Sequence, residues 1–503
     1  MKRNKHSLSH NRLLSCDMGA LVPIGWFEVL PGDTIQHATS ALLRASPMLS
    51  PVMHPMDVRI HHWFVPYRLL WSSFEDFITG GPSGTSLPTF PTITFASAPG
   101  LGSLSDYLGV PHSVTGQVVS ALPYRAYARI WNESYRDEDL QSALVQSTAD
   151  GNDTTTSTAI QNISWEKDYF TSARPFEQKG PAVSLPLGTS APVKTNASDL
   201  VTGAQTALKL RQAPTGNVFP ASKGLGVDSG SNVFAGDNPL VNVTATAYPS
   251  NLFADLSSAT AATVNQLRQA MAIQRFEEAR ARYGSRYVEY LRYLGVRSSD
   301  ARLQRAEYLG GGKNRVQFSE VLQVGPSASP DQANTVGALK GHGISAMRSN
   351  RYRRFIEEHG LIMSLLSIRP KTIYMNGLDK KFNRRLKEEF WQRELEHIGQ
   401  QAVKNKEVYS AAASPDGTFG YQDRYDEYRR IESGVSGEFR TILNYWHLAR
   451  DFSSEPALNA AFVSSVPTMR TFASTTTDPF YVMAAHSIQA RRMVSKKGNS
   501  FIF

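Results

Sequence analysis

Basic side chains in three separate clusters are the residues of this sequence whose chemistry points most clearly to a ligand. Guanidinium and ammonium groups bind phosphate oxygens, and an aromatic ring beside them gives a nucleic-acid base a surface on which to stack. Tyr352 offers such a ring within the central cluster. The clusters consist of Lys2, Arg3, Lys5 and Arg12 near the N-terminus, Arg348, Arg351, Arg353 and Arg354 in the middle, and Arg491, Arg492, Lys496 and Lys497 near the C-terminus.

These clusters predict contact with the phosphate backbone of a flexible single strand, and ordinary solubilising charge is the competing interpretation of each cluster taken alone. No zinc finger, RNP motif or helix-turn-helix pattern accompanies them, so the sequence does not support sequence-specific recognition. The candidate contact residues are Lys2, Arg3, Lys5, Arg12, Arg351, Arg353, Arg354, Arg491, Arg492, Lys496 and Lys497.

The net charge of the chain agrees with an anionic partner. Its 503 residues include 53 Lys and Arg against 44 Asp and Glu, a formal net charge of +9. This excess favours nucleic acid first and an anionic membrane second, without identifying either. Hydrophobic residues make up 41% of the chain, enough to bury a large core, which excludes disorder for most of it.

Motifs that carry catalytic or metal chemistry are incomplete. The segment GGGKN at 310–314 resembles a phosphate-binding loop, but Asn314 stands where Ser or Thr would bind magnesium, and we expect a flexible turn there. His61 and His62 are adjacent on an expected strand and so point to opposite faces, which makes them poor ligands for one metal. The sequence predicts no catalytic, cofactor-binding or metal-binding residue and no cofactor.

The single cysteine and the N-terminal segment limit the cellular context. Cys16 has no partner for an intrachain disulfide and cannot form a thiolate metal cage. No apolar run follows the basic N-terminus, so we expect no secretory signal, and no segment has the 18 or so apolar residues of a spanning helix.

The elements that must position the basic clusters are mainly strands. Residues 57–65 alternate between two faces, and the apolar run at 362–369 is typical of a buried strand. Apolar residues at helical spacing predict helices over 71–81, 123–140 and 263–295, while 438–450 fits either a strand or a helix.

A long segment at 181–260 differs from the rest of the chain. It has eight charged residues in eighty and is dominated by Gly, Ser, Thr, Asn and Pro. A structureless loop of this length is improbable inside a compact domain. We therefore expect a large insertion of loops and short strands, either packed on itself or ordered against copies of itself.

Seven blocks of sequence resemble one protein family. The longest, LSCDMGALVPIGWFEVLPGDTIQHATSALLRASPMLSPVMHPMDVRIHHWFVPYRLLWSSFEDFITGG, is similar to the N-terminal part of the major capsid protein of gokushovirus-like microviruses, the small icosahedral single-stranded DNA phages of the Microviridae. Ala306 departs from the family pattern, which has proline there. The matching blocks are 14–81, 121–140, 165–173, 295–313, 358–377, 419–430 and 444–452.

The resemblance implies a mainly β fold: an eight-stranded antiparallel jelly roll, the viral capsid β-barrel, with long loop insertions and a few helices. Residues 1–503 would form one jelly-roll capsid domain. Within it, 186–262 would be an inserted surface loop that forms threefold protrusions and contacts the host. Residues 1–13 would be a basic N-terminal arm and 488–503 a basic C-terminal tail.

The resemblance also implies a structural protein of the virion, not an enzyme, that assembles in the host bacterial cytoplasm. It would form a T=1 shell through fivefold, threefold and twofold contacts with copies of itself, around circular single-stranded DNA and without a membrane. About 60 copies would carry roughly +540, far fewer charges than the genome has phosphates. Polyamines, metal ions or a small basic internal protein would then supply the remaining charge, and a minor or pilot capsid protein and a host receptor are further expected partners.

Two alternatives stay open from the residues alone. The first is a single-stranded nucleic-acid-binding protein that does not assemble, which rests on the same charges. The second, an all-β hydrolase acting on polysaccharide, needs two carboxylates that converge across a groove, and sequence spacing cannot show this.

Overall fold

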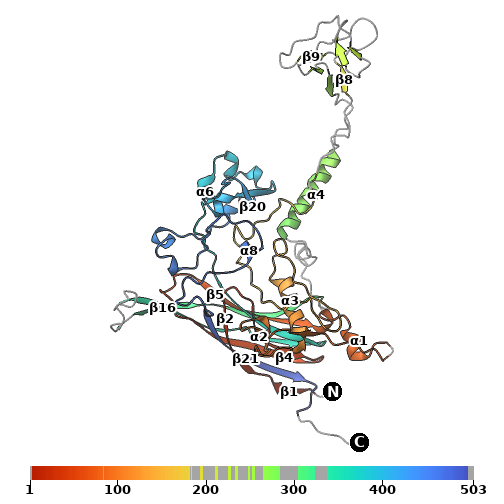
Figure 1. Ribbon diagram of the computed structural model, residues 1–503, viewed down its shortest axis with the longest axis vertical. Coiled ribbons are helices and arrows are strands. Elements are labelled where there is room, and N and C mark those ends of the chain that lie inside the picture. The colour runs from red at the N-terminus through yellow and green to blue at the C-terminus, as the bar shows by residue number, and fades with distance from the viewer. Residues whose placement is uncertain are drawn as a thin grey trace. The chain divides into compact units, whose positions relative to one another are not determined.

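The protein is described here from a computed structural model that covers residues 3–82, 84–181, 183, 264–283, 304–322, 324 and 337–496, together with six short strands between 193 and 254. The chain divides into two compact units (Figure 1). One consists of 1–177 and 283–503, and the other of 178–282.

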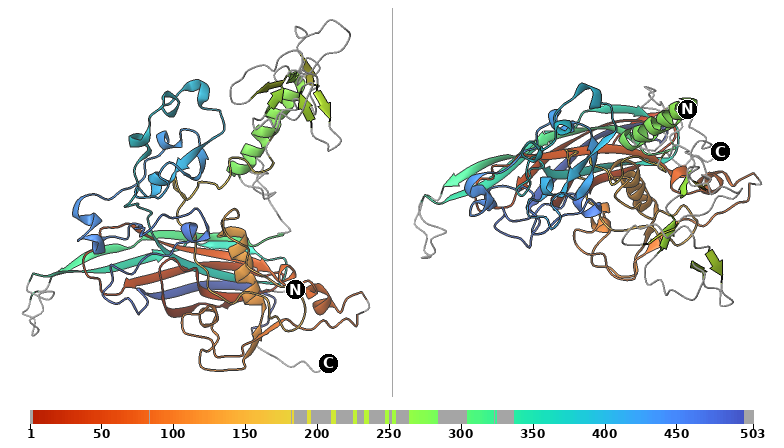
Figure 2. Two further views of the ribbon diagram at one scale, coloured as in Figure 1. Left: turned by 45° about the horizontal axis from the view of Figure 1, so that its top comes forward. Right: turned by 90° about the horizontal axis from the view of Figure 1, so that it is seen from above.

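The first unit is built on two antiparallel sheets packed face to face (Figures 1 and 2). The seven-stranded sheet contains β1 (Asn4–Ser7), β2 (His10–Cys16), β4 (Thr34–Ala45), β15 (Gln317–Leu322), β16 (Leu339–Arg348), β17 (Tyr352–Phe355) and β21 (Phe480–Arg492). The four-stranded sheet has the order β14 (Glu307–Arg315), β5 (Met56–Pro66), β18 (Gly360–Pro370) and β3 (Val22–Val29).

Alternating side chains explain how the two sheets pack. Leu43 and Val482 of the seven-stranded sheet share one buried cluster with Ile60 and Leu366 of the four-stranded sheet. The strand expected at 57–65 is confirmed as β5. His62 is buried between the sheets, whereas His61 lies on the other face of β5, as period-two alternation requires.

A helix covers the second face of the four-stranded sheet. Helix α3 (Leu122–Ser134) buries Tyr127 and Trp131 in one cluster with Met363 of β18. Because β18 is covered on both faces, nearly all of its residues are buried, which explains the apolar run at 362–369. The helix predicted over 123–140 is confirmed as far as 134, and a turn follows in which the Gln141 side chain accepts a hydrogen bond from the backbone of Asp137.

Short elements make up the long connections. The helix predicted at 71–81 is confirmed as α1 (Phe74–Thr79), which ends at the left-handed Gly80. The ambiguous segment at 438–450 forms two single 3₁₀ turns, η8 and η9. The remaining connecting elements are η1 (Tyr67–Leu69), β6 (Thr92–Thr94), α2 (Leu104–Leu108), β7 (Val118–Ser120), α6 (Lys380–Asn383), η5 (Lys387–Glu389), η6 (Arg393–Leu395), β19 (Gln400–Lys404), α7 (Asn405–Val408), β20 (Thr418–Asp423), η7 (Asp426–Tyr428), η8 (Gly437–Arg440), η9 (Asn444–Trp446) and α8 (Ala460–Val463).

The prediction of a flexible turn at 310–314 is wrong, because these residues lie within strand β14. Gly310 has a φ of +142° beside an irregularity in the pairing with β5, and a Cβ on Gly311 would lie 2.2 Å from the carbonyl oxygen of Ile60. The glycines therefore allow a bulge and a close backbone approach inside a sheet.

In the second unit, the described residues form three antiparallel strand pairs and one helix. Helix α4 (Val264–Tyr283) confirms the first part of the helix predicted over 263–295, and 284–295 lies outside the described residues. The strand pairs are β8 (Val193–Thr195) with β13 (Leu252–Ala254), β9 (Leu210–Gln212) with β12 (Ala247–Pro249), and β10 (Leu225–Val227) with β11 (Val233–Ala235). That 186–262 forms a surface protrusion stays a prediction.

The mainly β class is confirmed: antiparallel sheets with few helices, an architecture compatible with a capsid β-barrel. Among the helices that the structure describes, none has the length and apolar character needed to cross a membrane.

Candidate nucleic-acid interface

The basic clusters meet on one face of the seven-stranded sheet, the face turned away from the four-stranded sheet, which we call the basic face. Side chains of a strand alternate between faces, so the register fixes which residues point outward. Ile35 and Ile488 are buried and point inward, whereas Gln36 and Gln489 between their neighbours point outward. The outward strand positions include the cations Lys5, Arg44, Lys340, Arg348, Arg353 and Arg491.

These outward strand positions carry no Asp or Glu. Lys5, Arg353 and Arg491 have exposed side chains and no ion-pair partner in the part of the chain described here. A face that carries positive charges and no negative ones creates a positive potential, which attracts anionic polymers.

Three of the cations surround a pocket of about 150 Å³ over strand β4. Lys5 on β1 pairs with Arg491 on β21, and Arg491 pairs in turn with Thr34 on β4. The pocket is lined by Lys5, Thr34, Gln36, Arg353, Gln489 and Arg491. The structure thus brings together one member of each basic cluster, from segments far apart in the sequence.

Two further candidates lie beside this pocket. Arg3 donates to the carbonyl of Gly32 at 2.9 Å and to the hydroxyl of Thr34 at 3.1 Å, and its guanidinium lies 5.7 Å from the centre of the Phe355 ring. Arg351 donates to the side-chain oxygen of Gln36 at 3.4 Å. Neither contact neutralises the charge of the arginine.

Three candidates are not on the basic face, because each follows or precedes an outward residue by one position. Arg354 forms a 2.7 Å ion pair with Glu307, and Arg492 forms one of 2.7 Å with the buried Asp33. Arg12 points to the inner side of β2, where burial lowers its pKa and its guanidinium contacts the backbone of Asp106. These arginines stabilise the fold locally.

The expected role of Tyr352 in base stacking does not fit its position. Its hydroxyl lies 3.0 Å from Nδ1 of His37 on the inner side of the sheet, and burial raises its pKa. The aromatic rings exposed on the basic face are instead Phe355, 51% exposed, and Tyr481, 47% exposed. The period-two alternation of the two strands was the signal that could have identified both.

Much of the two terminal segments belongs to strands of the seven-stranded sheet. Strands β1 and β2, which cover 4–7 and 10–16, pair with successive parts of β21, and 488–492 belong to β21 itself. Lys496 is exposed just beyond β21, while Lys2 and Lys497 lie outside the described residues.

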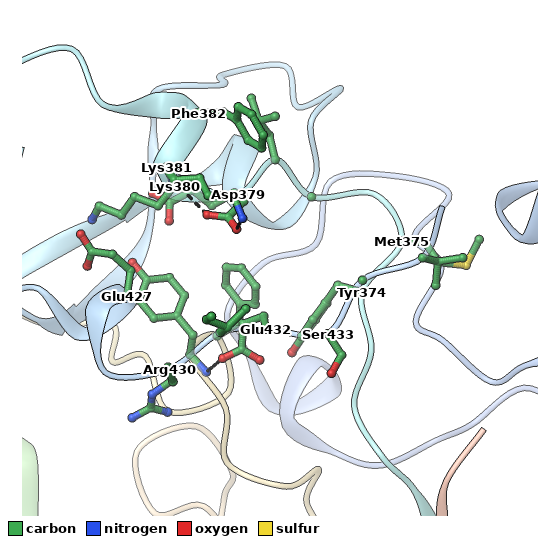
Figure 3. A pocket seen from close by; sticks show the side chains of 18 of the residues that line it. Tyr374, Met375, Asp379, Lys380, Lys381, Phe382, Glu427, Arg430, Glu432 and Ser433 are labelled. Atoms are coloured by element: carbon green, nitrogen blue, oxygen red, sulfur yellow. Dashed lines mark hydrogen bonds and ion pairs between the residues drawn. The ribbon is translucent and has the colours of Figure 1, made fainter. Parts of the chain in front are cut away.

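A larger cavity, of about 490 Å³, lies among the loops that follow β18 (Figure 3). The Tyr374 hydroxyl donates to Asp168 at 2.9 Å, and Glu432 accepts the backbone N–H of Tyr169 at 2.9 Å. Burial, aided by nearby Asp168, raises the pKa of Glu432. These acids hold loops together, and in the described part of the chain no three His, Cys, Asp or Glu side chains come together as metal ligands.

Antiparallel sheets with long connecting loops, acids committed to structural contacts and one cationic face together describe a structural protein. The chain belongs to the capsid protein (F protein) family, which matches residues 1–501. The resemblance to microvirus capsid proteins is thereby confirmed.

Three similar proteins are named capsid protein VP1. That of Bdellovibrio phage phiMH2K is 36% identical over 88% of this chain and 84% of its own length. That of Chlamydia phage 1 is 33% identical over 92% of this chain and 89% of its own, and that of Spiroplasma virus 4 is 30% identical over 92% and 87%. The chain is a structural capsid protein of the virion, not an enzyme, and it assembles with copies of itself into a shell.

Proposed function

We propose that this capsid protein forms a T=1 icosahedral shell around circular single-stranded DNA and that its basic face contacts the genome. The observation that carries the proposal is the basic face itself, where six outward cations on the strands are accompanied by no outward acid. Phe355 and Tyr481 add two exposed rings for sequence-independent stacking.

The strand order supports an eight-stranded jelly roll as the building block. Strands β1 and β2 pair with successive parts of β21, and β16 and β17 with successive parts of β4, so each pair acts as one interrupted strand. With β15 set aside as an added edge strand, both sheets then have four strands. This arrangement fits the two four-stranded sheets of a jelly roll.

The remaining partners follow from charge and surface. A net charge of +9 per copy leaves most phosphates of a genome unneutralised, so a small basic internal protein or small cations would accompany the DNA. The low-charge insertion at 186–262 would form threefold protrusions that contact a host receptor. A minor or pilot protein and assembly in the host cytoplasm belong to the same proposal.

Negative-stain electron microscopy of the purified protein tests the shell. We expect uniform isometric particles with surface knobs, and loss of the knobs with retained particles when 186–262 is deleted. A protein that stays monomeric in a sizing column with and without single-stranded DNA would contradict the proposal.

Binding of an oligothymidylate tests the basic face. We expect affinity to fall steeply with salt, and Arg44→Gln with Arg348→Gln to reduce the salt dependence because both residues point outward. The matched control is Arg354→Gln, which removes an arginine paired with Glu307 on the inner side. Equal losses in the two variants would contradict the assignment of this face.

A further inference from the structure

The pocket over β4 has an unusual charge arrangement for a site on a sheet. Lys5 and Arg491 are directly opposite each other on neighbouring strands, where two like charges destabilise the pairing. Arg353 on β17 lines a third side of the pocket, and none of the described residues that line it is an acid. Within the described part of the chain, these three cations therefore lie together without a counter-charge.

The neighbouring arginines show that the chain does supply counter-charges elsewhere. Arg354 and Arg492, each one position further along the same strands, pair with Glu307 and Asp33 at 2.7 Å. These two inward arginines each pair with a carboxylate, whereas the structure described here gives the outward cations at the pocket no such partner. An anion from outside the chain fits the position of the absent carboxylate.

The neutral lining residues add hydrogen-bond donors. The Thr34 hydroxyl oxygen accepts from Arg3, which leaves its hydrogen free to donate, and the amide oxygen of Gln36 accepts from Arg351, which leaves its NH₂ group. The volume of about 150 Å³ lies below the roughly 300–1,000 Å³ of pockets that enclose drug-sized ligands. A small tetrahedral anion fits this pocket better than a base with its sugar.

We propose that this pocket binds a single phosphate group of the genome backbone, shared by Lys5, Arg353 and Arg491. The inference deepens the proposed function and rests on it. It has a structural consequence, because the bound phosphate links the N-terminal strand β1 and the last strand β21 to β17 across β4. Contact with the genome would then stabilise the edge of the sheet where the short strand β1 is held.

Thermal unfolding of the full-length protein tests the pocket with inorganic phosphate as the probe. We expect phosphate to raise the Tm above that in chloride of equal ionic strength. Lys5→Gln with Arg491→Gln should abolish this increment, while leaving the Tm without phosphate unchanged or higher because the repulsion is relieved. Lys5→Arg keeps the charge and should keep the increment.

The matched control is Arg44→Gln with Arg348→Gln, which removes two outward cations away from the pocket. It should retain the phosphate increment. The proposed phosphate site would be overturned if phosphate still raised the Tm of the Lys5 and Arg491 variant, or if the control variant lost the phosphate effect equally.

The salt dependence of oligothymidylate binding separates one shared phosphate from three independent contacts. Each phosphate neutralised on a single strand contributes about 0.7 to the slope of log affinity against log salt. Replacing Lys5, Arg353 and Arg491 together by Gln should therefore lower the slope by about 0.7, whereas three separate contacts would lower it by about 2.

The two proposals fail in different ways. If the wild-type protein binds oligothymidylate and the triple variant keeps the full slope or loses about 2, the phosphate pocket is wrong and the basic face stands. If the wild-type protein does not bind oligothymidylate, the contact of the basic face with DNA is itself wrong.

Discussion

His37 of the seven-stranded sheet and His62 of the four-stranded sheet meet between the two sheets, with ring centres 4.5 Å apart. Nε2 of His37 also lies 3.2 Å from Nδ1 of His486, and the Thr39 hydroxyl lies within 3.0 Å of both rings. His62 completes its contacts with the Ser364 hydroxyl at 2.8 Å. The protein therefore has a polar network at the centre of an otherwise apolar interface.

This network predicts a loss of stability in mild acid. Burial lowers the pKa of His37 to about 2, of His62 to about 3 and of His486 to about 4. As the pH falls below about 6.5, the histidine pKa of the unfolded chain, the unfolded chain binds protons before the folded protein does. The free energy of unfolding therefore decreases with falling pH until the pH reaches the histidine pKa values of the folded protein. At pH 5 the loss is about 2 kcal/mol for each histidine. Urea unfolding at pH values from 7.5 to 4.5 measures it.

A variant separates this network from general acid denaturation. His62→Asn should lower stability at neutral pH but reduce its pH dependence, because one of the three buried groups no longer titrates. His342→Asn is the control, since His342 is an exposed residue of β16. Equal pH dependence in wild type and His62→Asn would contradict the account.

Local patterns in the sequence were sufficient for several elements. Alternation at 57–65 predicted β5 and the opposite faces of His61 and His62, and the apolar run at 362–369 predicted a buried strand. Alternation also implies that only one of Arg353 and Arg354 can face outward. The glycines at 310–312 misled the prediction because turn residues and close-approach residues are the same type.

The pocket on the basic face could not be predicted from such patterns. Lys5 and Arg491 become neighbours only through the pairing of β1 with β21, and Arg353 joins them through β4. Pairing between distant strands is set by the packing of the whole core, and one sequence does not reveal it. Alternation within each strand could have placed Phe355 and Tyr481 on an outward face, but only the pairing of both strands with β4 puts the two rings on the same face of one sheet.

A buried ion pair between Arg125 of α3 and Asp153 predicts a large loss of stability on removal of either charge. Both side chains are fully buried, and the Arg125 guanidinium also donates to the carbonyls of Leu70 and Ala149 at 3.0 and 2.9 Å. Asp153→Asn leaves the buried guanidinium without its counter-charge, and we expect a loss of about 3–5 kcal/mol in the free energy of unfolding.

Urea unfolding monitored by circular dichroism measures this loss. Glu133→Gln is the control, because Glu133 pairs with Arg129 on a more exposed part of the same helix. That variant should lose less than about 1 kcal/mol. Similar losses in the two variants would show that Arg125 tolerates an unpaired charge.

Position 311 of β14 requires glycine because the backbone of the neighbouring strand β5 approaches it closely. A Cβ at this position would lie 2.2 Å from the carbonyl oxygen of Ile60 on β5, so Gly311→Ala must displace a strand. We expect a loss of about 1–3 kcal/mol in the free energy of unfolding. Gly100→Ala is the control, because a Cβ there meets no atom within 4 Å. A neutral Gly311→Ala would favour the flexible turn that the sequence first indicated.

The exposed ring of Tyr481 predicts a contribution to single-strand binding that is not electrostatic. Tyr481 is 47% exposed on the basic face and pairs directly with Arg44 on the neighbouring strand β4, so its ring lies beside a cation where a base can stack. Tyr481→Ala should weaken oligothymidylate binding by about 1–3 kcal/mol, the usual contribution of one stacked base. The slope of log affinity against log salt should stay unchanged, because no phosphate contact is removed.

Tyr481→Phe is the control, because it keeps the ring and should keep the affinity. Fluorescence anisotropy can measure the affinity of the wild type and both variants. A Tyr481→Ala variant that loses slope but not affinity at low salt would assign the residue to the positioning of Arg44 instead of to stacking.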